Sequence, residues 1–268
     1  DESDYATTFV ADCNDLGAKT FYFRVTDASG NTSTGSEVIT IADQTAPIIS
    51  GVSGTTIGLD GSGSATITAS DEYVTATDNC TASGSLTYLV STASDGTFAA
   101  TTTVDCADLG SLDLYFKVQD GSGNTSSASA AASFTIQDIF QPTLTASDVT
   151  VSLDGEGDYT LDPSAVSPSA TDNCASSFTY TLSVDNATWV SSLAFDCADL
   201  GANTVYVRAY DGASYSEGVS VTVTVQDTTG PAVSSSDANL ILDAAGAVTM
   251  TASDVSAVAS DNCSGSPT

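Results

Sequence analysis

The sequence predicts an all-β chain, built as a tandem array of ~90-residue immunoglobulin-like antiparallel β-sandwich domains. Three observations lead to this prediction. Apolar residues alternate with a period of two, short turn motifs follow one another at regular intervals, and the same motifs recur along the whole chain. About seven short strands fit into each repeat length, and no segment shows convincing helical periodicity.

The strands and turns of one copy can be placed in chain order. Residues 149–153 alternate apolar and hydroxyl side chains, which predicts an early strand, and the turn sequence 154–157 follows it. Residues 205–210 and 219–225 alternate in the same way and predict the last two strands. The segment 128–132 is helix-prone in composition, but it leads into an apolar alternation and is better interpreted as the start of a last strand.

Two cysteine motifs mark the repeat and together use all six cysteines. Asp-Cys-x-Asp-Leu-Gly occurs three times at spacings of 93 and 91 residues, and Asp-Asn-Cys occurs three times at spacings of 94 and 89 residues. The first motif contains Cys13, Cys106 and Cys197, and the second contains Cys80, Cys174 and Cys263.

The repeat predicts four segments. Residues 44–138 and 139–227 are complete copies, whereas 1–43 is the C-terminal half of a copy and 228–268 is the N-terminal half. Proline-containing linkers such as 43–47 separate the copies, and proline restricts bending there. We expect the chain to be a window of three repeat lengths from a longer periodic polypeptide.

The composition excludes several classes of function. The 268 residues include 34 Asp and Glu, four Lys and Arg and no His, which gives a formal net charge of −30. A chain without histidine has no imidazole base, and a polyanion does not hold nucleic acid or an anionic membrane surface. No apolar stretch is long enough to insert into a membrane. The carboxylates recur in every copy, as structural residues do, so we expect no enzyme.

The cysteines are expected to form one disulfide within each complete copy. Cys80 is predicted to pair with Cys106 and Cys174 with Cys197, which closes loops of roughly 25 residues worth ~3 kcal/mol each. Cys13 and Cys263 are predicted to pair outside this window. The alternative, a thiolate metal site, requires close Cys-x-x-Cys pairs, and the sequence has none. Disulfides imply an oxidising compartment.

Several motifs together resemble a known family of modules. The run 76–80, the Cys-x-Asp-Leu-Gly element, the turn 118–126 and the Asp…Pro junction are similar to hyalin-repeat (HYR-like) immunoglobulin-type modules. The resemblance covers the whole chain and is greatest to tandem copies in giant secreted surface adhesins and filament proteins of Bacteroidetes, exported by the type IX system. It implies an extracellular stalk or adhesive fibre. Residues 211–214 depart from the turn of the family pattern.

Acidic residues are predicted to gather at the junctions between copies. In an immunoglobulin-like sandwich the incoming linker, one loop and one hairpin turn lie at the same end. Carboxylate and amide oxygens converging there suit calcium. The alternative is that each Asp only caps its own turn. The candidate ligands are Asp43, Asp78, Asn79, Asp120 and Asn124, then Asp138, Asp172, Asn173 and Asp211, and then Asp227, Asp261 and Asn262.

The leading hypothesis for function is a structural stalk segment of an extracellular bacterial filament or giant adhesin. Its expected partners are further repeats of the same chain and a homo-oligomeric fibre. The competing hypothesis is a carbohydrate- or cell-surface-binding module that binds a glycan or a cell surface through exposed tyrosines and Trp189, the only tryptophan. Arg24, Lys117 and Arg208 recur at one position of each copy, where a salt bridge or a cation–π contact is expected.

Overall fold

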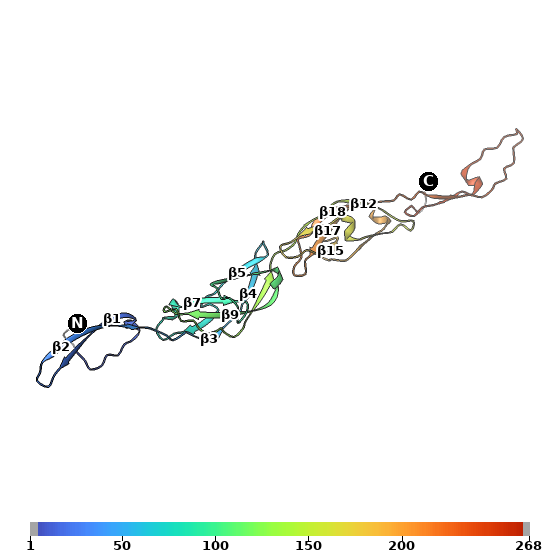
Figure 1. Ribbon diagram of the computed structural model, residues 1–268. Coiled ribbons are helices and arrows are strands. Elements are labelled where there is room, and N and C mark those ends of the chain that lie inside the picture. The colour runs from blue at the N-terminus through green and yellow to red at the C-terminus, as the bar shows by residue number, and fades with distance from the viewer. Residues whose placement is uncertain (1–4, 265–268) are drawn as a thin grey trace. The chain divides into compact units, whose positions relative to one another are not determined.

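The computed structural model describes residues 5–264 and has the all-β architecture that the sequence predicts (Figure 1). The chain folds as two compact units, Asp1–Asp138 and Ile139–Thr268. Each unit contains one four-stranded sheet together with shorter two-stranded pairs. None of the described helices is long and apolar enough to cross a membrane.

The first unit begins with a hairpin. The strands β1 (Gly17–Thr26) and β2 (Thr32–Ile41) pair antiparallel without interruption. Asp27 holds the turn between them, because its Oδ1 accepts hydrogen bonds from the backbone N–H groups of Ser29 and Asn31 at 2.9 and 2.8 Å. The apolar side chains of this hairpin are largely uncovered.

Each copy of the first cysteine motif forms a short 3₁₀ turn just before a long strand. In η3 (Cys106–Asp108) the side chain of Asp105 accepts from the N–H of Ala107, and the side chain of Asp108 accepts from the N–H of Asp105. The same capping box forms in η1 (Cys13–Asp15) and η5 (Cys197–Asp199). The glycine that ends the motif has a positive φ, +103° at Gly110, which favours glycine. The motif is therefore a local folding signal.

The strands between Ile48 and Asp138 form a two-layer, mostly antiparallel sandwich (Figure 1). One layer has the order β4-β10-β9-β7, in which β10 pairs parallel with β4 and antiparallel with β9. The other layer consists of the pairs β3-β6 and β5-β8. The strands are β3 (Ile48–Val52), β4 (Thr56–Leu59), β5 (Ser64–Thr68), β6 (Val74–Thr77), β7 (Thr87–Ser91), β8 (Thr101–Asp105), β9 (Gly110–Gln119) and β10 (Ala132–Asp138), with η2 (Ser83–Ser85) and η3 between them.

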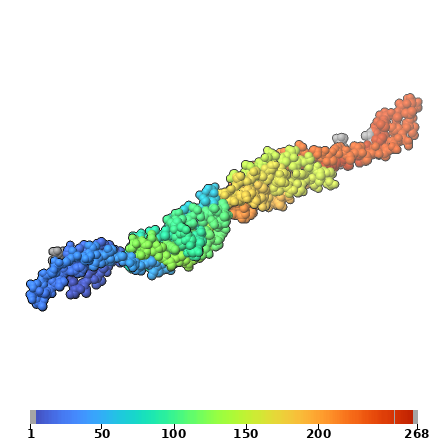
Figure 2. All heavy atoms as spheres, in the orientation of Figure 1, coloured from blue at the N-terminus to red at the C-terminus, as the bar shows by residue number. Residues whose placement is uncertain are grey.

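The core of this sandwich lies between the two layers. Alternate residues of β9 and β10 are fully buried, among them Phe116 and Phe134 at 0% exposure. Tyr73, just before β6, contacts both rings, with centroids 6.3 Å from Phe116 and 5.3 Å from Phe134. The space-filling view shows the residues of this segment packed as one solid body (Figure 2). The period of two in the sequence thus reports burial between two sheets.

Residues 139–227 repeat the same strand order. The four-stranded layer is β12-β18-β17-β15, with β18 parallel to β12 and antiparallel to β17, and the second layer consists of the pairs β11-β14 and β13-β16. The elements are β11 (Thr143–Thr145), β12 (Val149–Ser152), β13 (Tyr159–Leu161), η4 (Pro163–Val166), β14 (Ser169–Thr171), β15 (Thr179–Ser183), β16 (Leu193–Phe195), η5, β17 (Gly201–Tyr210) and β18 (Val219–Gln226).

The end of the described chain is a single strand pair. The strands β19 (Ala232–Ser234) and β20 (Val258–Ser260) pair antiparallel, with η6 (Ala252–Val255) between them. Apolar side chains in this segment are exposed, for example Ile241 at 89%. The pair has the place in the sequence that β11-β14 has in residues 139–227.

Candidate metal centre

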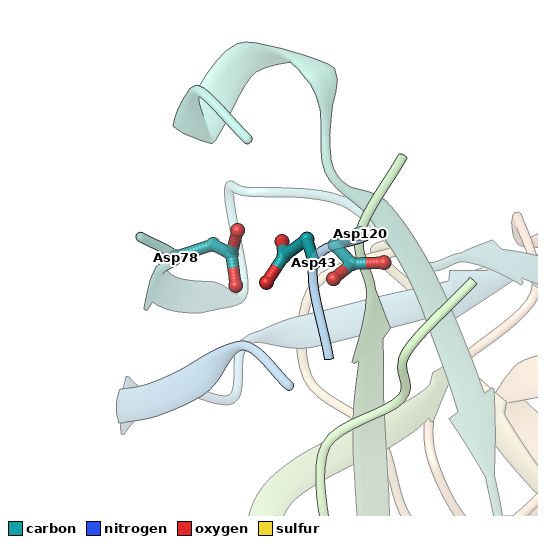
Figure 3. Close-up of side chains that lie close together, drawn as sticks. All are labelled: Asp43, Asp78 and Asp120. Atoms are coloured by element: carbon teal, nitrogen blue, oxygen red, sulfur yellow. The ribbon is translucent and has the colours of Figure 1, made fainter. Parts of the chain in front are cut away.

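Three aspartates from separate parts of the chain meet at one end of the sandwich. Asp43 follows β2, Asp78 follows β6 and Asp120 follows β9. One carboxylate oxygen of each lies within 4.8 Å of the other two. Figure 3 shows the carboxylate of Asp43 between those of Asp78 and Asp120. Strand topology brings these ends together, because β6 and β9 both point towards this end of the sandwich.

Two of the aspartates also cap their own turns. Asp78 Oδ2 accepts from the backbone N–H groups of Cys80 and Thr81 at 3.0 and 2.8 Å. Asp120 Oδ1 accepts from the N–H groups of Ser122 and Asn124 at 2.9 and 2.7 Å. The capping interpretation of these residues is therefore correct as far as one oxygen of each carboxylate is concerned.

Asn124 and Asn79 attach the linker to the sandwich. Asn124 Nδ2 donates to Asp120 Oδ2 at 2.7 Å and to the backbone carbonyl of Asp43 at 3.1 Å. Asn79 Nδ2 lies 3.3 Å from Asp43 Oδ1, which also accepts from the N–H of Thr45 at 3.0 Å. Asp43 is consequently held in place from both sides, with 8% of its surface exposed.

The remaining oxygens of this group make it a candidate for a cation. Asp43 Oδ2 and Asp78 Oδ1 are buried and have no hydrogen-bond partner. The ion pair found among the described residues, Lys19 with Asp15 at 3.7 Å, lies elsewhere, so no cationic side chain neutralises the three carboxylates. A buried, unpaired carboxylate oxygen is costly, and a hard cation that takes oxygen ligands removes that cost.

Hydrogen bonding keeps Asp120 ionised. Burial raises the pKa of its carboxyl, but the bonds from the Asn124 side chain and from the N–H groups of Asn124, Ser122 and Gly123 outweigh burial and leave the pKa below its usual value. Asp27, in the equivalent turn of the first hairpin, has its pKa lowered chiefly by the bond from the Asn31 side chain. The turn itself thus favours a charged carboxylate.

Within the second unit, Asp172 and Asp211 have the places that Asp78 and Asp120 have in the first, after β14 and after β17. Asp172 Oδ1 accepts from the N–H groups of Cys174 and Ala175, both at 2.9 Å, and its Oδ2 is buried without a partner. The same division between a capping oxygen and an unpartnered one therefore recurs in the next copy.

The third predicted set, Asp227, Asp261 and Asn262, stays a prediction. Asp261 Oδ2 accepts from the N–H of Ser264 at 3.0 Å while its Oδ1 is buried and unpartnered, and Asp227 Oδ1 accepts from the N–H of Thr229 at 2.9 Å. Asn262 Nδ2 donates to the carbonyl of Asp154 at 3.0 Å.

The predicted disulfide pairing is wrong. Cys80 bonds to Cys13, not to Cys106, and Cys197 bonds to Cys263, not to Cys174. Cys106 and Cys174 are also disulfide-bonded, and the structure has no free cysteine. Cys13 and Cys263 therefore have their partners inside the chain.

The register of the strands gives the reason. The pairing of Ser64 with Asp105 places Cys106 beside the start of β5, where its Sγ lies 3.4 Å from the carbonyl of Gly63. Cys80 lies beyond the far end of β6, and the strand rise puts roughly 40 Å between the two cysteines. A disulfide needs Cα atoms about 4.4–6.8 Å apart. The two cysteines of one copy thus lie at opposite ends of the sandwich.

The recurring cations lie against aromatic rings, as expected. Arg24 lies 4.3 Å from the ring centroid of Tyr5, and Lys117 lies 4.5 Å from that of Phe98. Arg208 lies between Trp189 at 4.3 Å and Tyr215 at 3.7 Å. One face of the Trp189 ring is therefore covered by the chain's own guanidinium.

Comparisons with known proteins identify no family. No family profile matches the chain, and no curated protein matches it. Similar solved structures include mouse clustered PcdhgC3 EC1-3, with 17% identity and a TM-score of 0.33 over 79% of this chain and 78% of that one. Protocadherin Gamma B2 extracellular cadherin domains 3–6 have 17% identity and a TM-score of 0.33 over 88% and 63%. The Protocadherin GammaB4 extracellular domain has 16% identity and a TM-score of 0.36 over 82% and 41%.

Proposed function

We propose that this chain is a stalk segment of an extracellular adhesin or surface filament, made of tandem immunoglobulin-like repeats with the boundaries 1–43, 44–138, 139–227 and 228–268. The repeated order of the four-stranded sheet supports the two complete copies. The hairpin β1-β2 corresponds to β9-β10, and the pair β19-β20 corresponds to β11-β14, which supports the two halves.

The observation that carries the proposal is the position of the acidic groups. Asp43 belongs to a linker and lies with two aspartates from the loops of the following copy. Asp138, Asp172 and Asp211 are proposed as the equivalent set of the next linker. A cation at such a place ties the linker to that copy. Calcium is the proposed ion, because Asp43, Asp78 and Asp120 offer only oxygen and flexible turns accommodate its coordination.

An extracellular location follows from the disulfides, which persist in oxidising surroundings. The high negative charge keeps separate chains apart at low ionic strength, so assembly into a fibre is proposed to require salt or divalent ions. A bacterial source and type IX export are proposed from the sequence resemblance alone.

Solution scattering of the purified chain tests the stalk proposal. Calcium should increase the radius of gyration or narrow its distribution relative to EGTA, because junctions that bind the ion bend less. Asp78→Ala combined with Asp120→Ala should reduce the change by the share of the first junction, whereas Asp27→Ala, in an equivalent turn, should preserve all of it. Scattering that is the same with calcium and with EGTA counts against a cation-stiffened stalk.

The competing glycan-binding hypothesis stays a prediction. Arg208 lies over one face of the Trp189 ring, so a sugar would have to stack on the other face. Binding of residues 44–227 to a glycan array, lost on Trp189→Ala, would favour recognition over a purely mechanical role.

A further inference from the structure

Two disulfides close large loops around the linkers. Cys13 lies just before β1 and Cys80 lies beyond β6, so the bond encloses the hairpin β1-β2, the linker with Pro47, and the strands β3 to β6. Cys197 and Cys263 enclose β17, β18, the linker with Pro231 and the pair β19-β20 in the same way. The sequence separations are 67 and 66 residues.

Such a loop offers tension two parallel paths. One path is the disulfide, which spans a Cα–Cα distance of 5.2 Å in both cases. The other is the polypeptide inside the loop, whose length when extended is on the order of 230 Å. The short path becomes taut first, so the long path stays slack while the bond is intact.

We propose that Cys13–Cys80 and Cys197–Cys263 carry mechanical tension past the linkers, so that the enclosed strands and linkers are never pulled apart end to end. The linkers then set the orientation of the segments, and the covalent bonds set their maximum separation. This mechanical role goes beyond the stalk proposal, because it depends only on which cysteines are bonded and not on where the protein works.

The contacts around the first bond fit this division of roles. Cys13 Sγ lies 3.4 Å from the carbonyl of Asn79, whose side chain contacts Asp43 of the linker. The covalent path and the linker therefore meet the sandwich at the same loop. A cation at Asp43 holds the linker there, while the disulfide prevents a complete separation if that hold is lost.

The four cations of this chain make the covalent map easy to test. Trypsin cuts the denatured chain after Lys19, Arg24, Lys117 and Arg208. Without reductant, fragment 1–19 should stay attached to 25–117, and 209–268 should stay attached to 118–208. Pairing within each copy would instead release 1–19 and 209–268 as free peptides, and their release would overturn the proposal.

Force spectroscopy of the full chain, held at its two ends, tests the load path itself. The oxidised chain should extend by about 450 Å less than the same chain in which both loops are opened, since each loop hides roughly 230 Å. Cys13→Ser with Cys80→Ser should release only one such increment. Cys197→Ser with Cys263→Ser should release the other and serves as the matched variant.

The outcomes separate this proposal from the stalk proposal. Extension increments of the expected size in force spectroscopy support the proposal that the disulfides carry tension, even if calcium has no effect on scattering. Equal extension of the oxidised chain and of either double variant would overturn the load path, whatever the chain's cellular role.

Discussion

Asp43→Asn should change the stability of the chain in opposite directions with and without calcium. In EGTA, wild type holds three carboxylates together with two buried, unpartnered oxygens, Asp43 Oδ2 and Asp78 Oδ1. Asparagine removes one negative charge and offers an N–H donor to the facing carboxylate after a small rotation. One such hydrogen bond is worth about 1 kcal/mol, so Tm should rise by roughly 4–8 °C.

In calcium the order should reverse. Extracellular calcium modules bind with a Kd of about 10⁻⁴–10⁻³ M, so 10 mM calcium stabilises the wild-type fold by about 1.4–2.7 kcal/mol. That corresponds to an increase in Tm of roughly 6–20 °C, most of which the variant should lose because it has one carboxylate fewer. Asparagine keeps the turn, since its Oδ1 still accepts from the N–H of Thr45.

Differential scanning fluorimetry in 10 mM calcium and in EGTA measures the Tm of the variant and of wild type in both conditions. Asp27→Asn is the matched control, because Asp27 caps an equivalent turn and belongs to neither acidic group. It should shift Tm by the same amount in both buffers. If Asp43→Asn shifts Tm by the same amount in both buffers, the aspartate only caps its turn, and the reasoning is refuted.

Three further predictions concern the fold. Phe116→Ala should lower the free energy of unfolding by about 3–5 kcal/mol in urea, since Phe116 is 0% exposed. Phe23→Ala, at the equivalent position of β1, should cost far less, because Phe23 is 50% exposed. Equal losses for the two variants would contradict the assigned core. Cys13→Ser with Cys80→Ser should lower the free energy of unfolding by roughly 4 kcal/mol, from the closure of a loop of this length; an unchanged value in calorimetry would be inconsistent with that bond. Hydrogen bonds from the Thr188 N–H, the Ser183 hydroxyl and the Ala187 N–H hold the pKa of Asp185 far below its usual value. The stability that ionised Asp185 contributes is therefore complete above about pH 4 and is lost as pH falls below that. Asp185→Asn should lose less stability than wild type over this acid range, and identical acid unfolding profiles would argue against the role of Asp185.

The fold class was predictable because each signal for it is local or periodic. The alternation in β9 and β17 reports which residues face the core, and the capping box around Cys106 repeats in every copy. The meeting of Asp43, Asp78 and Asp120 was also predictable, since strand topology brings a linker, a loop and a turn to one end. What the sequence did not predict is how their oxygens divide between turn capping and a shared centre, because that depends on side-chain orientation.

The disulfide pairing failed for a different reason. Nearness along the chain favoured Cys80 with Cys106, but β5 and β8 run antiparallel, and that register carries Cys106 to the end of the sandwich opposite Cys80. The separations of 67 and 66 residues between bonded cysteines were present in the sequence as a signal, since they are constant across the chain. These separations predict the pairing only if disulfides are allowed to join neighbouring copies across a linker.

Two kinds of interaction hold a linker at the loop where it joins the sandwich. There Asp43 is fixed by hydrogen bonds from Asn79 and Asn124, and it belongs to an acidic group that a cation would neutralise. The neighbouring Cys13–Cys80 bond does not depend on ions and is broken only by a reductant. Calcium should therefore adjust how stiff a junction is, without changing how far it can be stretched. In force spectroscopy the maximum extension of the oxidised chain should be the same in calcium and in EGTA, while the force needed to straighten it should differ. A maximum extension that grows when calcium is removed would mean that ion contacts, and not the disulfides, limit the separation of neighbouring segments.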